Sequence, residues 1–328
     1  MGLLIEGQWH DQWYDTDKTG GRFEREKARF RHWVTPGGSP GPSGQGGFPA
    51  ESGRYHLYVS MACPWAHRTL IVRALKGLAP HISVSVVHPD MLENGWEFRP
   101  DDERYRDHLH NHRFLHQVYT RAVPDYSGRV TVPVLWDRRR DTIVSNESAE
   151  IIRMFNSAFD GLAGVRSDLD IYPEPLRAEI ERINQRVYDT VNNGVYKAGF
   201  ATVQDQYARA YHALFETLDW LEARLSDRRY LVGRQPTEAD WRLFTTLIRF
   251  DAVYYSHFKC NRQRLADFPV LSAYLRDLYQ TPGVRETVSI GQIKRHYYVS
   301  QRTINPTQIV PEGPQLDFEA AHGRETLV

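Results

Sequence analysis

One of the two cysteines in this 328-residue chain stands in a context that favours a reactive thiol. Cys63 follows a strand predicted over residues 55–60 and precedes a helix predicted over residues 69–76, with Pro64 suited to the first helical turn. The partial positive charge at a helix N-terminus favours a thiolate, which is the nucleophilic form of cysteine. A buried structural cysteine is the alternative, but the strand–loop–helix context leads us to predict a nucleophile.

The residues around Cys63 indicate how such a nucleophile would turn over. The motif reads Cys63-Pro64-Trp65-Ala66, so alanine stands where a dithiol oxidoreductase carries its second cysteine. Cys260 is far away in the sequence, and no local thiol could resolve a disulfide formed at Cys63. We therefore expect a monothiol cycle, in which an external thiol resolves a mixed disulfide.

A second segment could bind the backbone of a small peptide. In Thr131-Val132-Pro133 the proline sits inside an otherwise strand-like run. This placement is tolerated if the bond before Pro133 is cis and the proline ends the hydrogen-bond ladder. The backbone of the preceding residue would then be exposed to an extended tripeptide such as glutathione, which could pair with it as an added strand. An ordinary edge strand is the alternative.

A third segment could bind the charged end of that peptide. Glu147-Ser148 opens a helix predicted over residues 146–159. Ser148 and the backbone N–H groups at a helix start can bind a carboxylate, and Glu147 can meet an ammonium group. Capping alone would also explain these residue types. The γ-glutamyl end of glutathione carries both charges, and the three segments together predict a glutathione site.

The order of the predicted elements indicates a thioredoxin-like domain. A strand, a helix, a strand, a long connection, a hairpin and a helix follow one another. The second strand, the polar connection and the two hairpin strands are expected at residues 82–87, 90–127, 130–136 and 141–145.

The remainder of the chain is predicted to be helical. Seven apolar or aromatic residues recur at helical spacing between Tyr207 and Leu225. Thr237 and Asp240 resemble a capping box ahead of a helix through Phe250, and residues 272–280 form another expected helix. An α/β domain followed by an all-helical domain is the glutathione-transferase architecture. We expect an extended N-terminal arm, a thioredoxin-like glutathione-binding domain and a helical-bundle domain with a C-terminal tail at residues 1–52, 53–165 and 166–328.

Composition limits the class of protein. Hydrophobic residues make up 41% and charged residues 25% of the chain, which is typical of a folded soluble protein. The formal net charge of +0 favours neither nucleic acid nor an anionic membrane as a partner. The N-terminus does not read as a signal peptide, and no apolar run reaches the roughly 20 residues of a membrane span. With only two cysteines, we expect a cytoplasmic protein whose thiols stay reduced.

Longer motifs resemble one family. Residues 60–68 (SMACPWAHR) are similar to the signature of the glutathionyl-hydroquinone reductases, also called Xi-class glutathione transferases. The resemblance spans almost the whole chain, including the aromatic arm. It continues in residues 93–96, 127–137, 143–150, 192–200, 237–243, 257–260 and 304–307.

The resemblance implies roles for particular residues. Cys63 would be the nucleophile, and Tyr196 would donate or accept a proton near the quinol. Tyr254 and Tyr297 would hydrogen-bond near Cys63 and favour its thiolate, although Tyr255 and Tyr298 are adjacent alternatives. The glutathione site would comprise Trp96, Arg129, Val130, Thr131, Val132, Pro133, Glu147 and Ser148. The family also implies a homodimer, with glutathione and glutathionylated quinols as partners.

The implied reaction is chemically coherent. The Cys63 thiolate would attack the sulfur of a glutathione joined to a quinol ring through a thioether, and the ring carbon would leave. A carbanion is a poor leaving group, so the carbon needs a proton, and general acid catalysis by Tyr196 would contribute about 10²- to 10⁴-fold. A second glutathione would then attack the mixed disulfide, giving oxidised glutathione and restoring the thiolate.

A histidine cluster falls outside the family pattern. His108, His112 and His116, with His110 nearby, would share one face of a helix at i, i+4 and i+8. That spacing can bind a metal. A solvated helix face explains the cluster adequately, because no cysteine or obvious fourth ligand accompanies it, and we predict no metal site.

Other functions use the same scaffold. An omega-like transferase, acting as a dehydroascorbate reductase or deglutathionylase, is the main alternative, and a reductive dehalogenase is another. The long aromatic arm and the Tyr196 motif favour the hydroquinone reductase. A catalytically silent scaffold protein is also conceivable, but Cys63 and a complete glutathione site argue against it. The sequence identifies neither the physiological quinone, nor the main thiol of the host, nor the dimer interface.

Overall fold

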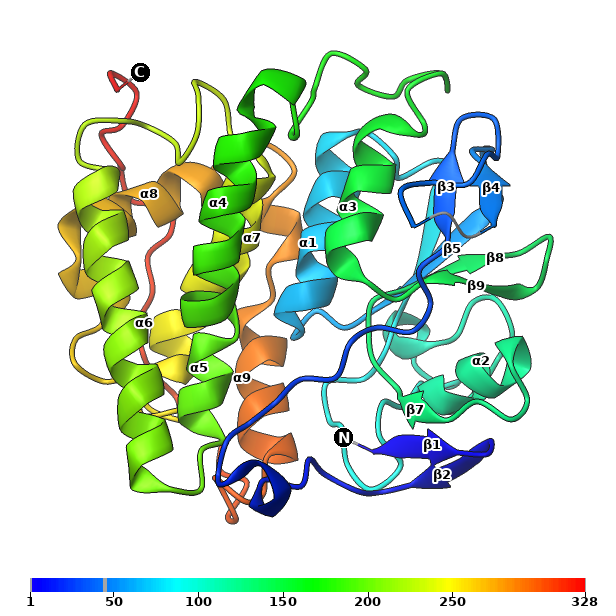
Figure 1. Ribbon diagram of the computed structural model, residues 1–328, viewed down its shortest axis with the longest axis horizontal. Helices are drawn as coiled ribbons and strands as arrows, with labels where there is room; N and C mark the ends of the chain where they lie inside the picture. The colour runs from blue at the N-terminus through cyan, green and yellow to red at the C-terminus, as the bar shows by residue number, and fades with distance from the viewer. Residues whose placement is uncertain (1, 44–45, 328) are drawn as a thin grey trace. The chain divides into compact units, whose positions relative to one another are not determined.

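A computed structural model describes residues 2–43 and 46–327 and divides the chain into two compact units (Figure 1). Unit 1 comprises Met1–Trp13, Glu26–Asp170 and Thr287–Ser300. Unit 2 comprises Tyr14–Arg25, Ile171–Glu286 and Gln301–Val328. Each unit is therefore assembled from three separate stretches of chain, and the N-terminal arm contributes to both.

Unit 1 is built on a four-stranded sheet with the order β6-β5-β8-β9. The central strand β5 (Tyr55–Val59) is buried along its whole length, pairs in parallel with β6 (Ile82–Val86) and pairs antiparallel with β8 (Val134–Asp137). Strand β9 (Thr142–Ser145) completes the sheet. Helices α1 (Pro64–Leu75) and α3 (Ser148–Ser157) lie side by side (Figure 1). This is the predicted thioredoxin-like order.

Two elements of unit 1 begin well away from the residue expected from the sequence. The strand expected over residues 130–136 begins only at Val134, because Pro133 lacks the N–H that a ladder residue must donate. The helix expected from residue 69 begins at Pro64, so that Cys63 itself becomes its N-cap residue. As a result, Cys63 lies immediately before α1 and Pro133 lies immediately before β8.

The arm, expected to be extended, contains four short strands within residues 2–43 and 46–52, the part that the structure describes. Strands β1 (Leu3–Ile5) and β2 (Gln8–His10) form a hairpin, and β1 also pairs with β7 (Gly128–Arg129). Strands β3 (Trp33–Thr35) and β4 (Gly47–Pro49) pair in parallel. The short helices of the arm and of the connection after β6 are η1 (Asp17–Thr19), η2 (Glu103–Tyr105) and α2 (Leu115–Ala122).

Unit 2 is helical, as predicted, and two of its helices end in π-helical turns. Helix α4 (Arg177–Val187) runs into the turn η4 (Tyr188–Asn192), and α7 (Glu238–Arg249) runs into η5 (Phe250–Tyr254). The other elements of unit 2 are η3 (Glu174–Leu176), α5 (Gly194–Gly199), α6 (Gln204–Arg224), η6 (Leu265–Asp267) and α8 (Pro269–Tyr279). The predicted capping box is present at the start of α7.

The last helix does not belong to the helical unit. After η7 (Arg285–Thr287), helix α9 (Ile290–Ser300) contributes to unit 1. No helix in the described ranges 2–43 and 46–327 is long and apolar enough to cross a membrane.

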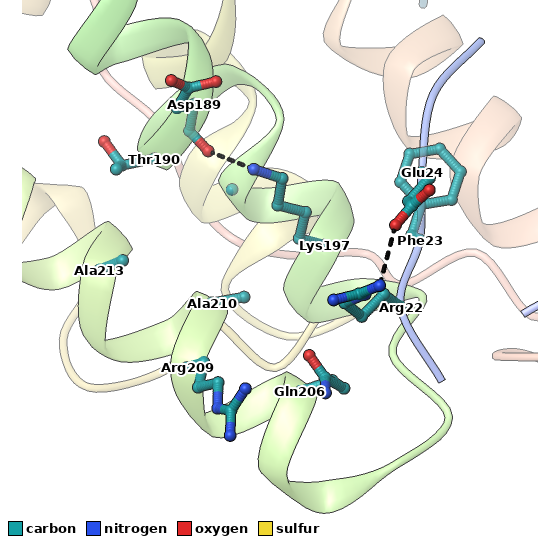
Figure 2. A pocket seen from close by; sticks show the side chains of 11 residues that line it. Arg22, Phe23, Glu24, Asp189, Thr190, Lys197, Gln206, Arg209, Ala210 and Ala213 are labelled. Atoms are coloured by element: carbon teal, nitrogen blue, oxygen red, sulfur yellow. Dashed lines mark hydrogen bonds and ion pairs between the residues drawn. The ribbon is translucent and has the colours of Figure 1, made fainter. Parts of the chain in front are cut away.

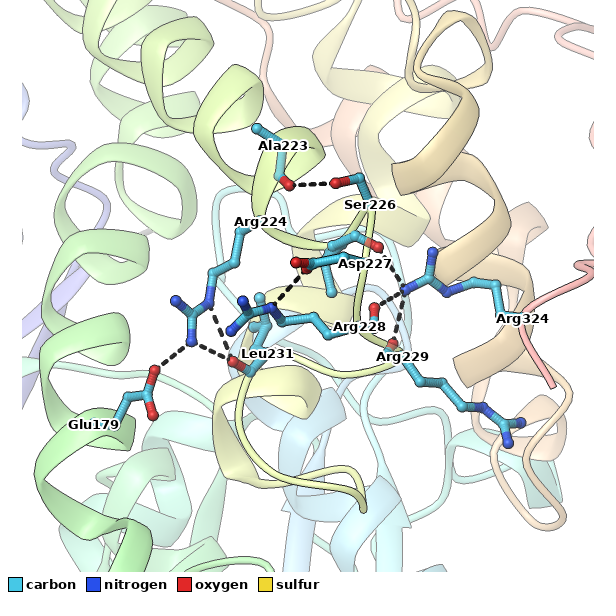
Figure 3. A network of polar contacts seen from close by, with 10 residues as sticks. Glu179, Ala223, Arg224, Ser226, Asp227, Arg228, Arg229, Leu231 and Arg324 are labelled. Atoms are coloured by element: carbon cyan, nitrogen blue, oxygen red, sulfur yellow. Dashed lines mark hydrogen bonds and ion pairs between the residues drawn. The ribbon is translucent and has the colours of Figure 1, made fainter. Parts of the chain in front are cut away.

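The C-terminal tail is anchored on unit 2 by a buried arginine (Figure 3). Arg324 is 3% exposed, and its guanidinium donates to the backbone oxygens of Leu225, Arg228 and Arg229 at 3.1, 2.6 and 2.9 Å. Arg224 of α6 donates in the same way to the carbonyl oxygen of Leu231. Leu225 is the C-cap residue of α6 and the other three carbonyls follow it, so the two arginines bind backbone carbonyls at and beyond the C-terminus of this helix.

Candidate active site

Cys63 lies at the positive end of a helix. It is the N-cap residue of α1, and its carbonyl accepts the first helical hydrogen bond from His67 N–H at 3.0 Å. Its Sγ atom lies 3.6 Å from the backbone oxygen of Val132. Cys63 is half-buried, whereas Cys260 is fully buried, and burial raises the pKa of the Cys260 thiol. The two cysteines, both reduced, therefore differ in accessibility and in electrostatic environment.

The segment beside Cys63 is held in place by a buried tyrosine. The Val132–Pro133 peptide bond is cis, as predicted. Tyr119 of α2 donates its hydroxyl to the carbonyl oxygen of Thr131 at 2.8 Å and accepts from the Thr131 N–H at 3.2 Å. The side-chain amide of Asn146 also donates to this hydroxyl, at 3.2 Å. One phenol thus connects residues 131–133 to the segment that starts α3.

Glu147 and Ser148 occupy the N-terminus of α3. The Glu147 carboxylate caps the helix by accepting from Ala149 N–H at 3.1 Å. Ser148 is buried, and Arg68 of α1 donates to its hydroxyl at 3.5 Å. The guanidinium of Arg68 also lies 4.5 Å from the ring centroid of Trp65. The N-terminus of α3 and a buried cation therefore favour negative charge beside Ser148.

The N-terminal arm runs along the same end of unit 1. The backbone N–H of Phe30 donates to the side-chain oxygen of Asn146, and Asn146 N–H donates to the Phe30 carbonyl, each at 3.2 Å. Arg31 makes a bidentate ion pair with Glu150, in the first turn of α3. The arm thereby fixes the residues on both sides of Glu147 and Ser148.

Trp96 lies in a loop that is clamped by two distant parts of the chain. Its ring is 4% exposed and stacks on His296 of α9, with ring centroids 4.7 Å apart. Helix α9 also holds the start of this loop, because Arg295 forms a bidentate ion pair with Asp90 at 2.7 Å and His296 bonds to the carbonyl of Pro89 at 2.8 Å. The C-terminal helix therefore sets the position of Trp96.

The N-terminal arm also contacts the loop that carries Trp96. Trp9 donates its indole N–H to the carbonyl of Glu93 at 2.9 Å, and its ring stacks on His116. A Cβ atom at Gly95, which has a φ of +71°, would lie 2.6 Å from the Trp9 ring. Glycine is therefore required at position 95 both by the backbone conformation and by the close approach of Trp9.

The side chain of Arg129 is engaged by the arm. Its guanidinium donates to the carbonyls of Gln12 and Trp13 and forms an ion pair with Glu26 at 3.1 Å. The adjacent residues Val130 and Val132 are buried. Arg129 thus connects the arm to residues 129–133, and its assignment to a glutathione site stays a prediction.

The tyrosines singled out from the sequence fall in both units. Tyr196 of α5 and Tyr254 of η5 lie in one aromatic cluster of unit 2, with ring centroids 6.1 Å apart, and both pack on Phe258. Tyr254 is fully buried, whereas Tyr255 is half-exposed. Tyr297 lies on α9 of unit 1, where its buried ring packs edge-on against His296.

A pocket in unit 2 was not anticipated from the sequence. It has a volume of about 480 Å³ and lies between residues 22–24 of the arm, η4, α5 and α6 (Figure 2). Lys197 and Arg209 supply positive charge to its wall, and the ring of Phe23 supplies apolar surface. A smaller pocket of about 240 Å³ shares Phe23 and Lys197. None of the predicted site residues lines either pocket.

The prediction of a histidine-bearing helix face is wrong. Helix α2 begins only at Leu115, so His108 lies in a turn, His112 lies in the irregular segment after it, and neither shares a helix with His116. The Asp107 carboxylate forms this turn by accepting from the backbone N–H groups of Leu109, His110 and His112. Among the residues that the structure describes, no group of three or more His, Cys, Asp or Glu side chains could hold a metal ion.

Comparisons with known proteins agree with this architecture. A family model described as the N-terminal domain of glutathione S-transferase matches residues 62–158, and one described as the C-terminal domain matches residues 204–277. The glutathionyl-hydroquinone reductase YqjG of Escherichia coli is 58% identical over 99% of each chain. The glutathionyl-hydroquinone reductase PcpF of Sphingobium chlorophenolicum is 53% identical over 96% of each chain. The predicted glutathione-transferase fold is confirmed.

Solved structures extend the likeness to the whole backbone. The glutathione-bound structure of E. coli YqjG superposes with a TM-score of 0.91, at 55% identity over 99% of each chain. A Xi-class glutathione transferase from Natrialba magadii superposes with a TM-score of 0.90, at 48% identity over 100% of this chain and 97% of the other. In both comparisons the sequence identity is far higher than two proteins need in order to share a fold. The chain belongs to the glutathionyl-hydroquinone reductase family, the Xi class of glutathione transferases.

Proposed function

We propose that this protein uses glutathione to reduce glutathionyl-hydroquinones to hydroquinones, through a mixed disulfide at Cys63. The activity is the one named for its relatives from E. coli and S. chlorophenolicum. The observation that carries the proposal is the position of Cys63, which is half-buried at the N-terminus of α1 and 3.6 Å from the Val132 carbonyl. A thiolate there is favoured by the helix terminus and adjoins the backbone of residues 131–132, with which another peptide could pair.

Glutathione would bind across the sheet end and the α3 N-terminus. Its cysteinyl backbone would pair with Val132, next to Thr131 and Pro133, and its γ-glutamyl carboxylate would meet Ser148 and the α3 N–H groups. Glu147 would meet the ammonium group, and Arg68 adds positive charge close to Ser148. Trp96 would pack on the peptide, with Arg129 and Val130 completing the site.

The reaction then divides into two thiol exchanges. The Cys63 thiolate attacks the sulfur of the glutathionyl group, forming an S–S bond while the S–C bond to the ring breaks. The electron pair of that bond remains on the ring carbon, which takes a proton from Tyr196, and hydroquinone leaves. A second glutathione thiolate attacks the glutathione sulfur of the mixed disulfide, so oxidised glutathione leaves and the Cys63 thiolate is restored. Tyr254 and Tyr297 would stabilise that thiolate by donating hydrogen bonds.

Other aspects of the proposal rest on the resemblance and on the composition. We propose a homodimer that works in the cytoplasm, where two unbridged cysteines stay reduced. We propose glutathione as a co-substrate and no metal cofactor. We also propose a functional division into an arm, a glutathione-binding domain and a helical domain at residues 1–52, 53–165 and 166–328.

A turnover assay tests the proposal. Purified protein is supplied with glutathione and a panel of glutathionyl-hydroquinones, including glutathionyl-menadiol, and the products are identified by mass. We expect one hydroquinone and one oxidised glutathione per conjugate consumed, and no turnover by Cys63→Ala. Dehydroascorbate serves as the rival substrate. Faster turnover of dehydroascorbate than of every conjugate would favour the omega-like alternative, and full activity of Cys63→Ala would refute the nucleophile.

A further inference from the structure

The N-terminal arm reaches the aromatic cluster that contains Tyr196. Phe23 is 4% exposed and packs on Tyr196 and Phe200, with ring centroids 6.3 and 5.3 Å away. The arm is anchored just before this point, because the Gly21 carbonyl accepts from Thr202 N–H at 3.2 Å. A Cβ atom at Gly21 would lie 2.4 Å from the Val203 side chain. Residues 21–25 are therefore fitted closely to the end of α5 and the start of α6.

Arg25 places a positive charge over the Tyr196 ring. Its guanidinium carbon lies 5.0 Å from the centroid of Tyr196 and 5.4 Å from that of Phe23. Its Nε atom donates to the side-chain oxygen of Asn193 at 3.1 Å, and Asn193 is buried immediately before α5. The guanidinium is thus fixed by the same helix that carries Tyr196. Arginine stays charged throughout the pH range of an enzyme assay.

The aromatic rings packed on Tyr196 differ from Arg25 in carrying no charge. The rings in contact belong to Phe23, Phe200, Tyr254 and Phe258, which are neutral at neutral pH. Lys197, which follows Tyr196 on α5, donates its ammonium group to the Asp189 carbonyl at 3.0 Å. Glu24, which precedes Arg25 on the arm, forms an ion pair with Arg22 at 3.3 Å. Among the contacts that the described residues make with the Tyr196 ring, Arg25 contributes a positive charge 5.0 Å from its centroid.

We propose that Arg25 is a positioning residue for Tyr196, and that it stabilises the phenolate left when Tyr196 gives up its proton. The proposal rests on the proposed function, in which Tyr196 protonates the departing ring carbon. A cation over a phenol ring attracts the ring in its neutral form, and attracts the phenolate more strongly because the negative charge is delocalised into the ring. Arg25 then makes Tyr196 a stronger acid without touching the substrate. The arm becomes part of the catalytic apparatus through this contact.

Three variants separate charge from packing. Arg25→Gln keeps a hydrogen-bonding side chain but removes the charge, and Arg25→Lys keeps a charge on a different shape. Arg22→Gln removes a neighbouring arginine of the arm, whose guanidinium pairs with Glu24 at 3.3 Å, and so serves as the matched control. The measurement is the pH dependence of kcat with a glutathionyl-hydroquinone at saturating glutathione.

The expected result is a displaced pH profile. Loss of the charge raises the pKa of Tyr196, so the alkaline limb of kcat moves up by about one pH unit in Arg25→Gln. Below that limb kcat falls about three- to tenfold, because the phenol is a weaker acid. The KM for glutathione stays unchanged. Arg25→Lys keeps most of the wild-type profile, Arg22→Gln keeps all of it, and Arg25→Gln moves no limb in a Tyr196→Phe background.

The opposite results overturn the proposal. If Arg25→Gln lowers kcat equally at every pH, or if Arg25→Lys is as impaired as Arg25→Gln, Arg25 acts only through packing. Direct titration keeps this test separate from the proposed activity. The tyrosinate ultraviolet absorbance of wild type minus Tyr196→Phe gives the Tyr196 titration, and the same difference is measured in the Arg25→Gln background. No shift between the two refutes the proposal even in a protein that turns over no conjugate.

Discussion

Removal of one hydroxyl, in Tyr119→Phe, is expected to loosen the site beside Cys63. The hydroxyl is fully buried and forms hydrogen bonds with the backbone N–H and carbonyl of Thr131, with the Asn146 amide and, at 3.4 Å, with the Thr131 hydroxyl. Burial raises the pKa of Tyr119, so it acts as a neutral phenol. The variant leaves an N–H, a carbonyl and an amide without this partner. At about 1 kcal/mol for each such bond, and more where the group stays buried, the loss is about 2–4 kcal/mol.

The assay has two readouts. Urea unfolding followed by circular dichroism should show the transition of unit 1 at a lower urea concentration, and the KM for glutathione should rise, because Tyr119 joins residues 131–133 to the start of α3. Tyr126→Phe is the matched control, since the Tyr126 hydroxyl makes one long bond, to the Arg129 carbonyl at 3.4 Å. Unchanged stability in Tyr119→Phe would refute the hydrogen-bond argument. A destabilised variant with unchanged KM would refute the link to glutathione binding.

Three further outcomes are expected. Trp9→Ala removes the bond to Glu93 and the stack on His116, and should raise the KM for glutathione several-fold with little change in kcat, as steady-state kinetics would show. Burial lowers the pKa of His56 to about 3. Between pH 6.5 and 3, His56 is therefore protonated in the unfolded chain and neutral in the folded chain. As the pH falls from 6.5 to 4, this residue alone should lower the free energy of unfolding by about 1.4 kcal/mol per pH unit. In urea titrations over this range, the free energy of unfolding of His56→Gln should decrease less steeply with falling pH than that of the wild type. Cys260→Ala should keep full turnover, and Cys260 in the wild type should resist alkylation at neutral pH by mass spectrometry, because its thiol is buried.

The parts of the site that local patterns describe could be predicted. Cys63 at a strand–helix junction, the proline at position 133 and the Glu147-Ser148 helix start each depend on a few consecutive residues, and the structure places all three as expected. The capping box of α7 was equally local. Such signals survive folding because the backbone conformation they favour is decided mainly by neighbouring residues.

The residues that hold the site together could not be predicted. Tyr119, Arg68 and Trp9 act through partners that the fold brings together, and a buried tyrosine or tryptophan carries no pattern that separates it from an ordinary core residue. Nor did the sequence indicate that α9 joins unit 1, where His296 stacks on Trp96. Spacing alone misled us at the histidine cluster, because the Asp107 side chain forms a turn where an unbroken helix was assumed.

The central claim is that Cys63 takes the glutathionyl group from the substrate. Its most direct test is a single turnover, in which the protein is mixed with excess glutathionyl-hydroquinone in the absence of any resolving thiol and is then analysed by intact mass and peptide mapping. The account predicts one glutathione bound to Cys63 and one hydroquinone released per chain, with neither in Cys63→Ala. Release of hydroquinone from a chain whose Cys63 stays unmodified, or an adduct confined to Cys260, would contradict it.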